Sequence, residues 1–137
     1  MSTADYNTQV INEFRENGGR VGGMFGSMPL LLLHHVGAKS GTERVSPVAY
    51  LEDGGRYAVF ASKAGAPENP AWYHNLMAHP DTRIEIGGQT IEVTASEAQN
   101  EERDRIYAEQ AKRLPQFGEY EQKTTRKIPV VLLTPKE

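Results

Sequence analysis

The sequence predicts an α+β fold, a small β-barrel of about six mostly antiparallel strands with helices packed outside it. Three observations favour this class. The chain has 137 residues, of which 38% are hydrophobic and 24% charged, as expected for one soluble domain over residues 1–137. Short apolar or alternating runs recur along the chain, and tight glycine-rich turns join consecutive runs. Because turns this short connect antiparallel neighbours, we expect hairpins rather than parallel crossovers.

The first helix is predicted over Ala4–Asn17, where Val10, Ile11 and Phe14 share a face with Tyr6 and two glycines follow. The apolar stripe is narrow. We expect this helix to dock on the body of the protein, with contact to a membrane or to a partner as the alternative.

Three strands in series follow and form an antiparallel meander. They are predicted over Pro29–Val36, Val45–Leu51 and Arg56–Ser62. The first is a continuous apolar run with two histidines, which indicates a strand buried on both faces. Gly37–Gly41 turns the chain between the first two strands, and Asp53–Gly55 does so between the second and third.

A second helix is predicted from Pro70 to about His79, with Asn69 as its N-cap. The hairpin Thr82–Ile86 and Gln89–Ala95 comes next, and its two-residue Gly-Gly loop sets the register.

In that register Ile84 lies opposite Ile91, and Arg83 lies opposite Glu92. An apolar face and a pair of opposite charges therefore come from one alignment, which supports it. The chain ends with a polar helix over Ser96–Arg113, a short helix over Phe117–Arg126 and a last apolar strand over Ile128–Leu133, in that order.

Composition and charge exclude several classes of function. The net charge of -3 gives no basic field that would attract nucleic acid. The chain has no cysteine for a disulfide or thiolate metal site, and its 4 histidines have no ligand-like spacing, so no metal site is predicted. Neither a secretory leader nor a membrane-spanning run is recognised, so a cytoplasmic location is expected, peripheral to a membrane if the first helix touches one.

Lys39, Arg44 and Lys63 are predicted to converge at one end of the sheet. Lys39 and Arg44 flank the first glycine turn, and Lys63 follows the third strand, which returns to the same end of the meander. Glycines there let backbone N–H groups approach a ligand closely. Two interpretations stay open, an anion-binding cradle and a set of solvated loop residues.

Trp72 is the single tryptophan, and it lies one helical turn before Leu76, a spacing typical of core packing. The alternative places its ring beside the anion site, with Pro47 and Ala49 lining the strand below. A planar heterocycle with an anionic tail would fit both parts of such a site.

Three separate segments carry a resemblance to a known family. They are VGAKSGTERVSP at 36–47, ASKAGAPENPAWYHNLMAHPD at 61–81 and RKIPVVLLTP at 126–135. Together they resemble the deazaflavin-dependent nitroreductases of actinobacteria, also described as F420H2-dependent quinone reductases. The resemblance implies a split β-barrel like that of flavin-binding relatives of pyridoxamine-phosphate oxidase, with coenzyme F420 as cofactor.

The resemblance also implies which residues contact the cofactor. The matching positions are Ala38, Lys39, Ser40, Arg44, Val45, Ser46, Pro47, Val48, Ala49, Phe60, Ala61, Ser62, Lys63, Ala71, Trp72, Tyr73, His74 and Asn75. The three cations among them would meet the phosphate and carboxylates of F420. Ala38 stands where many members carry arginine, so one contact to the cofactor tail is expected to be missing.

On the substrate side the resemblance implies Leu114, Phe117 and Tyr120, of which Tyr120 alone carries a hydroxyl. The expected reaction is hydride transfer from reduced F420 to a quinone, enone or nitro compound, with Tyr120, Ser62 or water as the proton donor. The apolar substrate side suits a quinone, and poor activation of bicyclic nitroimidazole prodrugs is expected.

Two other functions stay open. A flavin reductase or oxidase on the same barrel would hold FMN, and a non-catalytic F420 carrier or sensor would bind the cofactor without turnover. The expected partner is a small-molecule acceptor, and the expected assembly is a monomer or a homodimer.

Overall fold

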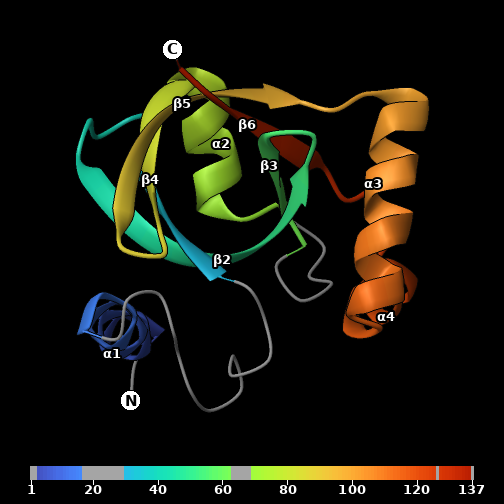
Figure 1. Ribbon diagram of the computed structural model, residues 1–137, viewed down its shortest axis with the longest axis horizontal. Coiled ribbons are helices and arrows are strands. Elements are labelled where there is room, and N and C mark those ends of the chain that lie inside the picture. Colours follow the sequence, from blue (N-terminus) through green and yellow to red (C-terminus); the bar gives the residue numbers. More distant parts are fainter. Residues whose placement is uncertain (1–2, 17–29, 63–68, 126, 137) are drawn as a thin grey trace.

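The computed structural model describes residues 3–16, 30–62, 69–125 and 127–136 of the chain (Figure 1). In chain order its elements are α1 (Thr3–Glu16), β1 (Leu30–Val36), β2 (Glu43–Asp53), β3 (Arg56–Phe60), α2 (Ala71–Ala78), β4 (Asp81–Ile86), β5 (Gln89–Glu97), α3 (Asn100–Arg113), α4 (Gln116–Lys123) and β6 (Val130–Pro135). Each predicted helix and strand therefore has a counterpart in the structure.

The strands close into a barrel in the order β1-β2-β3-β6-β5-β4. Every pairing between neighbouring strands is antiparallel, so the predicted fold class and the meander of the first three strands are confirmed. In Figure 1, α2 lies within the ring of strands, α3 and α4 stand together on one side, and α1 lies on another.

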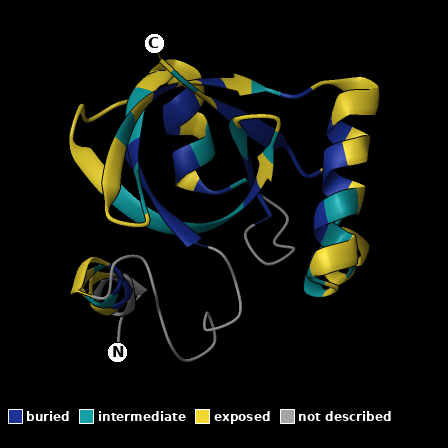
Figure 2. Ribbon diagram, in the orientation of Figure 1, coloured by how far each residue is buried: buried dark blue, intermediate teal, exposed yellow. Residues whose placement is uncertain are grey.

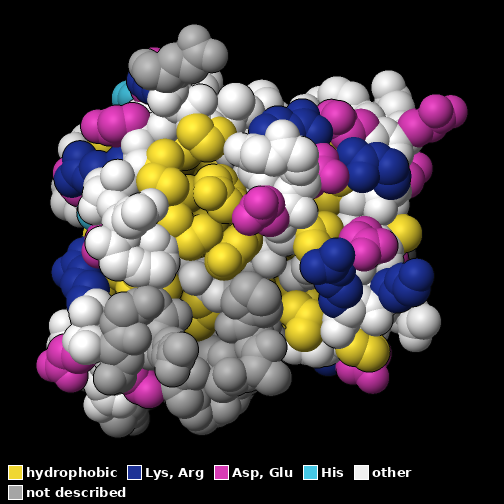
Figure 3. Space-filling model, in the orientation of Figure 1, with side chains coloured by type: hydrophobic (Ala, Val, Ile, Leu, Met, Phe, Trp, Pro, Cys, Tyr) yellow, Lys and Arg dark blue, Asp and Glu magenta, His cyan; other side chains and the backbone are white. Residues whose placement is uncertain are grey.

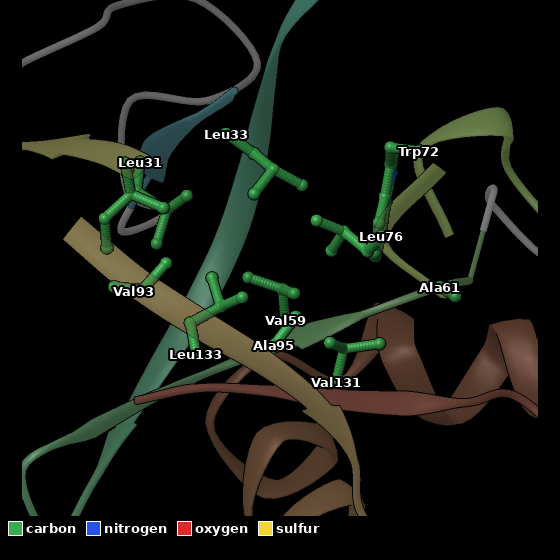
Figure 4. Packing of buried hydrophobic residues seen from close by; sticks show 11 residues of the cluster. Leu31, Leu33, Val59, Ala61, Trp72, Leu76, Val93, Ala95, Val131 and Leu133 are labelled. Carbon is green, nitrogen blue, oxygen red and sulfur yellow. The ribbon is translucent and has the colours of Figure 1, made fainter. Parts of the chain in front are cut away.

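The barrel interior is filled by apolar side chains that strand alternation points inward. Figure 4 shows side chains from the strands and from α2 meeting there. This inner cluster consists of Leu31, Leu33, Val59, Ala61, Trp72, Leu76, Ile84, Val93, Ala95, Val131 and Leu133. Figure 2 shows the matching burial pattern, with buried residues along the ring of strands and on α2.

Strand β1 is buried on both faces, as its continuous apolar run predicted. Leu31 and Leu33 belong to the inner cluster, whereas Leu30 and Leu32 belong to a second cluster on the outer face. Helix α1 covers that outer face through Val10 and Phe14, so the prediction of a docked helix is confirmed for this part of α1. Its Tyr6 side chain lies outside the described side chains.

The register of the second hairpin is the predicted one. Ile84 pairs with Ile91 and Arg83 with Glu92. Gly87, in the turn, has φ +57°, a left-handed conformation that glycine adopts without steric cost.

Two predicted helix starts are wrong by a few residues. Pro70, with φ -67° and ψ 155°, is the N-cap of α2, so the cap is not Asn69 and the helix begins at Ala71. Helix α3 begins at Asn100 rather than Ser96, because β5 continues to Glu97, which pairs with Val131 of β6. Pairing between strands far apart in sequence overrides the local helix signal there.

In the part of the chain that the structure describes, no helix combines the length and apolar character needed to cross a bilayer.

Candidate functional site

The turn between β1 and β2 is a compact hydrogen-bonded loop. Gly37 N–H donates to Thr42 O at 2.9 Å, and Gly41 N–H donates to Gly37 O at 2.9 Å. Ser40 Oγ accepts from Thr42 N–H at 3.2 Å. A Cβ at Gly37 would contact Ser40 Oγ, and Gly41 has φ +71°, so the turn depends on glycine at both positions.

A chain of side-chain hydrogen bonds ties this turn to α2 and to β2. Ala38 N–H donates to Asn75 Oδ1 at 3.0 Å. Asn75 Nδ2 lies 2.8 Å from His35 Nδ1, and His35 Nε2 lies 2.9 Å from Ser46 Oγ. The structure thus brings together three predicted cofactor residues, Ala38, Ser46 and Asn75, through a histidine that the sequence interpretation did not select.

Strand β2 has an open edge beside this turn. It pairs with β1 from Glu43 to Ala49, but with β3 only from Tyr50 to Asp53. Among the described residues, no strand pairs with the other side of β2 before Tyr50. Backbone N–H and C=O groups along such an edge seek hydrogen-bond partners, which a ligand can supply. The predicted cofactor residues Arg44 through Ala49 lie along this stretch.

Two of the three predicted anion-binding cations lie next to this edge, and both are exposed. Lys39 is in the turn, and Arg44 pairs with His35 in the sheet. Every other described arginine forms an ion pair, whereas neither Lys39 nor Arg44 pairs with a carboxylate of a described residue. Lys63 lies outside the described residues, so the convergence of all three cations stays a prediction.

Trp72 is buried, with 8% of its surface exposed, in the inner cluster beside Leu76. This agrees with the core-packing interpretation of its spacing. Val48 packs on the same inner cluster, but Ala49 packs on the outer clusters instead. Alternation along β2 places Pro47 on the side of Ala49. The structure therefore does not bring Trp72, Pro47 and Ala49 to one face of the strand.

The other predicted α2 residues differ in their surroundings. Tyr73 donates from its hydroxyl to Glu97 Oε1 at 2.5 Å, and burial together with this bond raises the pKa of Tyr73 to about 12. Ala71 and His74 are exposed, and the His74 ring lies 5.3 Å from the Tyr73 ring, edge to face. The β3 end is buried: Ala61 lies in the inner cluster, and Ser62 is 8% exposed.

The three predicted substrate residues gather on the outer face of the barrel. Phe117 lies 5.6 Å from the ring of Phe60 and 5.2 Å from that of Tyr120. Leu114, Tyr120 and Ala49 pack on the same outer cluster. Two predicted cofactor residues, Phe60 and Ala49, therefore share one apolar cluster with all three predicted substrate residues.

Helix α3 carries a buried polar residue, Gln110, that the sequence analysis did not single out. Gln110 is 1% exposed on the face that carries Ile106 and Tyr107, and its Nε2 has no hydrogen-bond partner among the described residues. A buried unsatisfied amide is rare in folded proteins. No pattern in the sequence separates it from the solvated glutamines.

A cavity of about 380 Å³ is lined by residues of β1, β2 and β4 among others, including His34, His35 and Arg83. The lysine and arginine that line it are already paired: Arg83 lies 2.6 Å from Glu43 Oε1, which is also 3.0 Å from His34 Nδ1, and Lys136 lies 3.2 Å from Asp81. Because its cations already have carboxylate partners, we do not place the anion site there. The described residues also hold no group of three or more side chains arranged to bind a metal ion.

Residues 7–135 match the family model described as F420H(2)-dependent quinone reductase. A protein of Mycobacterium tuberculosis (strain ATCC 25618 / H37Rv) named F420H(2)-dependent quinone reductase is 39% identical over 125 residues, which cover 88% of this chain and 84% of the relative.

Two solved structures are similar in sequence as well as fold. One is titled as the structure of an F420-H2 dependent reductase, FDR-A, with a TM-score of 0.70, 38% identity and coverage of 77% of this chain and 93% of that one. The other is titled as a domain-swapped dimer, with a TM-score of 0.71, 31% identity and coverage of 96% and 99%.

Proposed function

Because this chain belongs to the family of F420H(2)-dependent quinone reductases, we propose that its open β2 edge and the neighbouring turn bind reduced F420 for the reduction of a quinone. When bound, the reduced deazaflavin supplies the hydride. The observation that carries the proposal is a pair of exposed cations, Lys39 and Arg44, which form no ion pair with a described residue and lie beside a strand edge without a described partner.

The residues present fit the chemistry of this cofactor. F420 has a flat ring system and an anionic tail of phosphate and carboxylates. Lys39 and Arg44 pair with no carboxylate in the described part of the chain and would neutralise the tail, and the guanidinium of Arg44 suits a phosphate or carboxylate in bidentate geometry. Backbone groups of β2 between Arg44 and Ala49 supply donors and acceptors for a ring edge.

The apolar surface beside this edge fits the ring and the acceptor. Ala49, Leu114 and Tyr120 are half-buried and pack on one outer cluster, whose buried members include Phe60 and Phe117. Figure 3 shows another group of hydrophobic side chains, over the ring of strands that surrounds α2, in a different place from this cluster beside α3 and α4. Apolar walls exclude water from the reacting pair and favour a flat, uncharged quinone over a charged acceptor.

We propose Tyr120 and Ser62 as the candidate donors of the proton that the acceptor takes up when it is reduced. Tyr120 is half-buried at the edge of the outer cluster, and no described residue is hydrogen-bonded to its hydroxyl. Ser62 is buried at the end of β3. Replacing Tyr120 with Phe should lower the turnover number but leave F420 affinity unchanged if Tyr120 is the donor.

The family relationship supports F420 over FMN, and titration of both cofactors side by side tests that choice. We expect tight binding of F420, weak or absent binding of FMN, and turnover with the quinone menadione. Binding of F420 without any quinone turnover would point to a carrier or sensor instead.

The anion cradle is tested by the double variant Lys39→Gln/Arg44→Gln. Each charge-assisted contact contributes roughly 1–3 kcal/mol, so the Kd for F420 should rise at least about tenfold. The matched control Arg105→Gln/Lys127→Gln also removes two positive charges, but from the side of α3. There the side chain of Arg105 is 59% exposed and that of Lys127 is 63% exposed. An unchanged Kd for F420 in Lys39→Gln/Arg44→Gln would show that these two residues do not form the anion site.

For the assembly we propose a homodimer. The support is the domain-swapped dimer that matches 96% of this chain at 31% identity. Light scattering coupled to size exclusion tests it, and a monomer at every protein concentration would refute it.

A further inference from the structure

His35 is the central member of the chain of hydrogen bonds at the candidate site. It is 4% exposed and lies in β1, on the inward face between β2 and α2. Its neighbour His34 points to the other face and bonds to Glu43 and Glu85. The side chains of the two adjacent histidines therefore lie in different environments, because successive side chains of a strand point to opposite faces.

The geometry determines the protonation state of His35. The backbone N–H of Ala38 can only donate, so the Asn75 atom that it contacts is the carbonyl oxygen Oδ1. The amide nitrogen Nδ2 of Asn75 then donates to His35 Nδ1. Because Nδ1 accepts this bond, it carries no proton, and Nε2–H donates to Ser46 Oγ. His35 is thus the neutral Nε2–H tautomer.

The electrostatic surroundings agree with a neutral ring. Burial, followed by Coulombic interactions with Arg44 and His34, lowers the pKa of His35 from 6.5 to about 4. A proton on Nδ1 would face the Asn75 amide hydrogens. Rotation of the amide would then leave Ala38 N–H facing a second donor, so the chain of bonds works with one protonation state only.

We propose that His35 is a positioning residue for cofactor binding, which acts through Asn75 to hold the Gly37–Thr42 turn, and with it Lys39, in the position that receives the anionic tail. This inference rests on the proposed function of the site. It gives Asn75 a different role from the direct cofactor contact that the family resemblance implies. The amide oxygen of Asn75 holds the turn, and its nitrogen is held by His35.

Two measurements on the cofactor-free protein test the geometry. Long-range 1H–15N NMR should report the Nε2–H tautomer for one histidine, and the signal should disappear in His35→Leu. Amide exchange of Ala38 should be slow in the wild type and accelerate at least about tenfold in His35→Leu and in Asn75→Leu. A protonated or Nδ1–H ring at pH 7, or an Ala38 amide that exchanges equally fast in all three proteins, would overturn the proposal.

The effect on binding is tested by fluorescence titration of F420. We expect the Kd to rise about fivefold in His35→Leu, because the turn loses the fixed partner that holds Asn75. His35→Asn should restore binding to within about twofold, since its Oδ1 lies near the place of the imidazole Nδ1 and can accept from Asn75. His79→Asn, at an exposed histidine just after α2, is the matched control and should bind as the wild type does.

A double-mutant cycle separates this inference from the function on which it rests. If His35 acts through the turn that carries Lys39, then His35→Leu should have no further effect on the Kd in a Lys39→Gln background. Additive effects, or failure of His35→Asn to restore binding in a folded variant, would reject the positioning role. If Lys39→Gln/Arg44→Gln alone leaves the Kd unchanged, the proposed anion site fails, whatever the result for His35.

Discussion

Single residues decide the electrostatics at the turn between β1 and β2. Arg44 is exposed and unpaired with any described carboxylate, while the ring of His35 behind it is buried and neutral. Asn75 connects that ring to the backbone of Ala38. A cation at the surface and a neutral hydrogen-bonded support suit the binding of an anion, because a neutral ring does not repel the neighbouring guanidinium from its position.

His35 also makes stability depend on pH. Its pKa is lowered from 6.5 in the unfolded chain to about 4 in the folded protein. Between these values the unfolded chain binds a proton that the folded protein does not, so stability falls as the pH drops from 6.5 to 4. The loss is roughly 3 kcal/mol at most. Urea denaturation over this pH range should show the fall in the wild type and a flatter profile in His35→Asn.

Part of any acid destabilisation has another source. The pKa values of Glu43 and Glu85 are lowered, mainly by hydrogen bonds to His34 and Arg15 respectively. Their stabilising contributions are lost as the pH falls through their folded pKa values, at the acid end of the range. If the free energy of unfolding changes with pH equally in wild type and His35→Asn above pH 5, then His35 is not the group responsible for the acid destabilisation.

The buried side chain of Gln110 allows a second prediction about a single residue. Its buried Nε2 has no described partner, and an unsatisfied buried polar group costs about 1–3 kcal/mol. Gln110→Leu has a similar volume and removes that cost, so the free energy of unfolding should rise by about 1 kcal/mol. The control Gln122→Leu changes an exposed glutamine of α4 and should be near neutral. A destabilised Gln110→Leu would show that the amide is paired in solution.

Among the elements, α3 and α4 carry the outer cluster on which the three predicted substrate residues pack. They are joined by Tyr107, which donates from its hydroxyl to Phe117 O at 2.7 Å and packs edge to face on Phe60 at 5.8 Å. Arg103 ties the other end of α3 to the barrel through two bonds to Ile128 O, at 3.0 and 2.8 Å. The position of α4 on the outer face thus depends on α3.

Tyr107→Phe tests this dependence. Loss of the hydroxyl leaves the carbonyl of Phe117 unpaired and should cost about 1 kcal/mol of stability. Since Phe117 lies on the predicted substrate side, the KM for menadione should rise a few-fold, while the Kd for F420 stays unchanged. A change in F420 affinity with an unchanged KM would assign α4 to the cofactor rather than the acceptor.

Helix α1 is fastened to the barrel by apolar packing and by the ion pair between Arg15 and Glu85. Phe14 is 2% exposed, and Arg15 donates to both carboxylate oxygens of Glu85 at 3.0 and 2.7 Å. The apolar face of this helix between Val10 and Phe14 is therefore occupied by β1. This contact uses the residues that a membrane-bound or partner-bound helix would expose.

At the scale of the whole molecule, binding of the cofactor should stabilise the fold. A ligand that binds the folded state alone stabilises it by about 2.7 kcal/mol at 100 times its Kd. Thermal unfolding with F420 at that excess should therefore move the midpoint up by several degrees. FMN at the same concentration should produce little shift, and Lys39→Gln/Arg44→Gln should lose most of the F420 shift. An equal shift with FMN would contradict the cofactor assignment.

The local order of helices and strands could be predicted from the sequence alone. Apolar periodicity and glycine turns determine it, and the register of the second hairpin follows from a two-residue loop that permits one alignment. The family resemblance depended on short motifs of the same local kind. Both kinds of signal lie within a few tens of residues, so neither needs the folded structure.

Only the tertiary structure decided which of the predicted residues meet. Trp72 lies in the barrel interior while Ala49 packs on the outer clusters, because the wall of a closed barrel separates an inner from an outer environment. His35 and Asn75 are 40 residues apart, and their contact exists only because α2 enters the barrel beside β1. Contacts of this kind depend on chain packing at long range, for which a single sequence carries no local pattern.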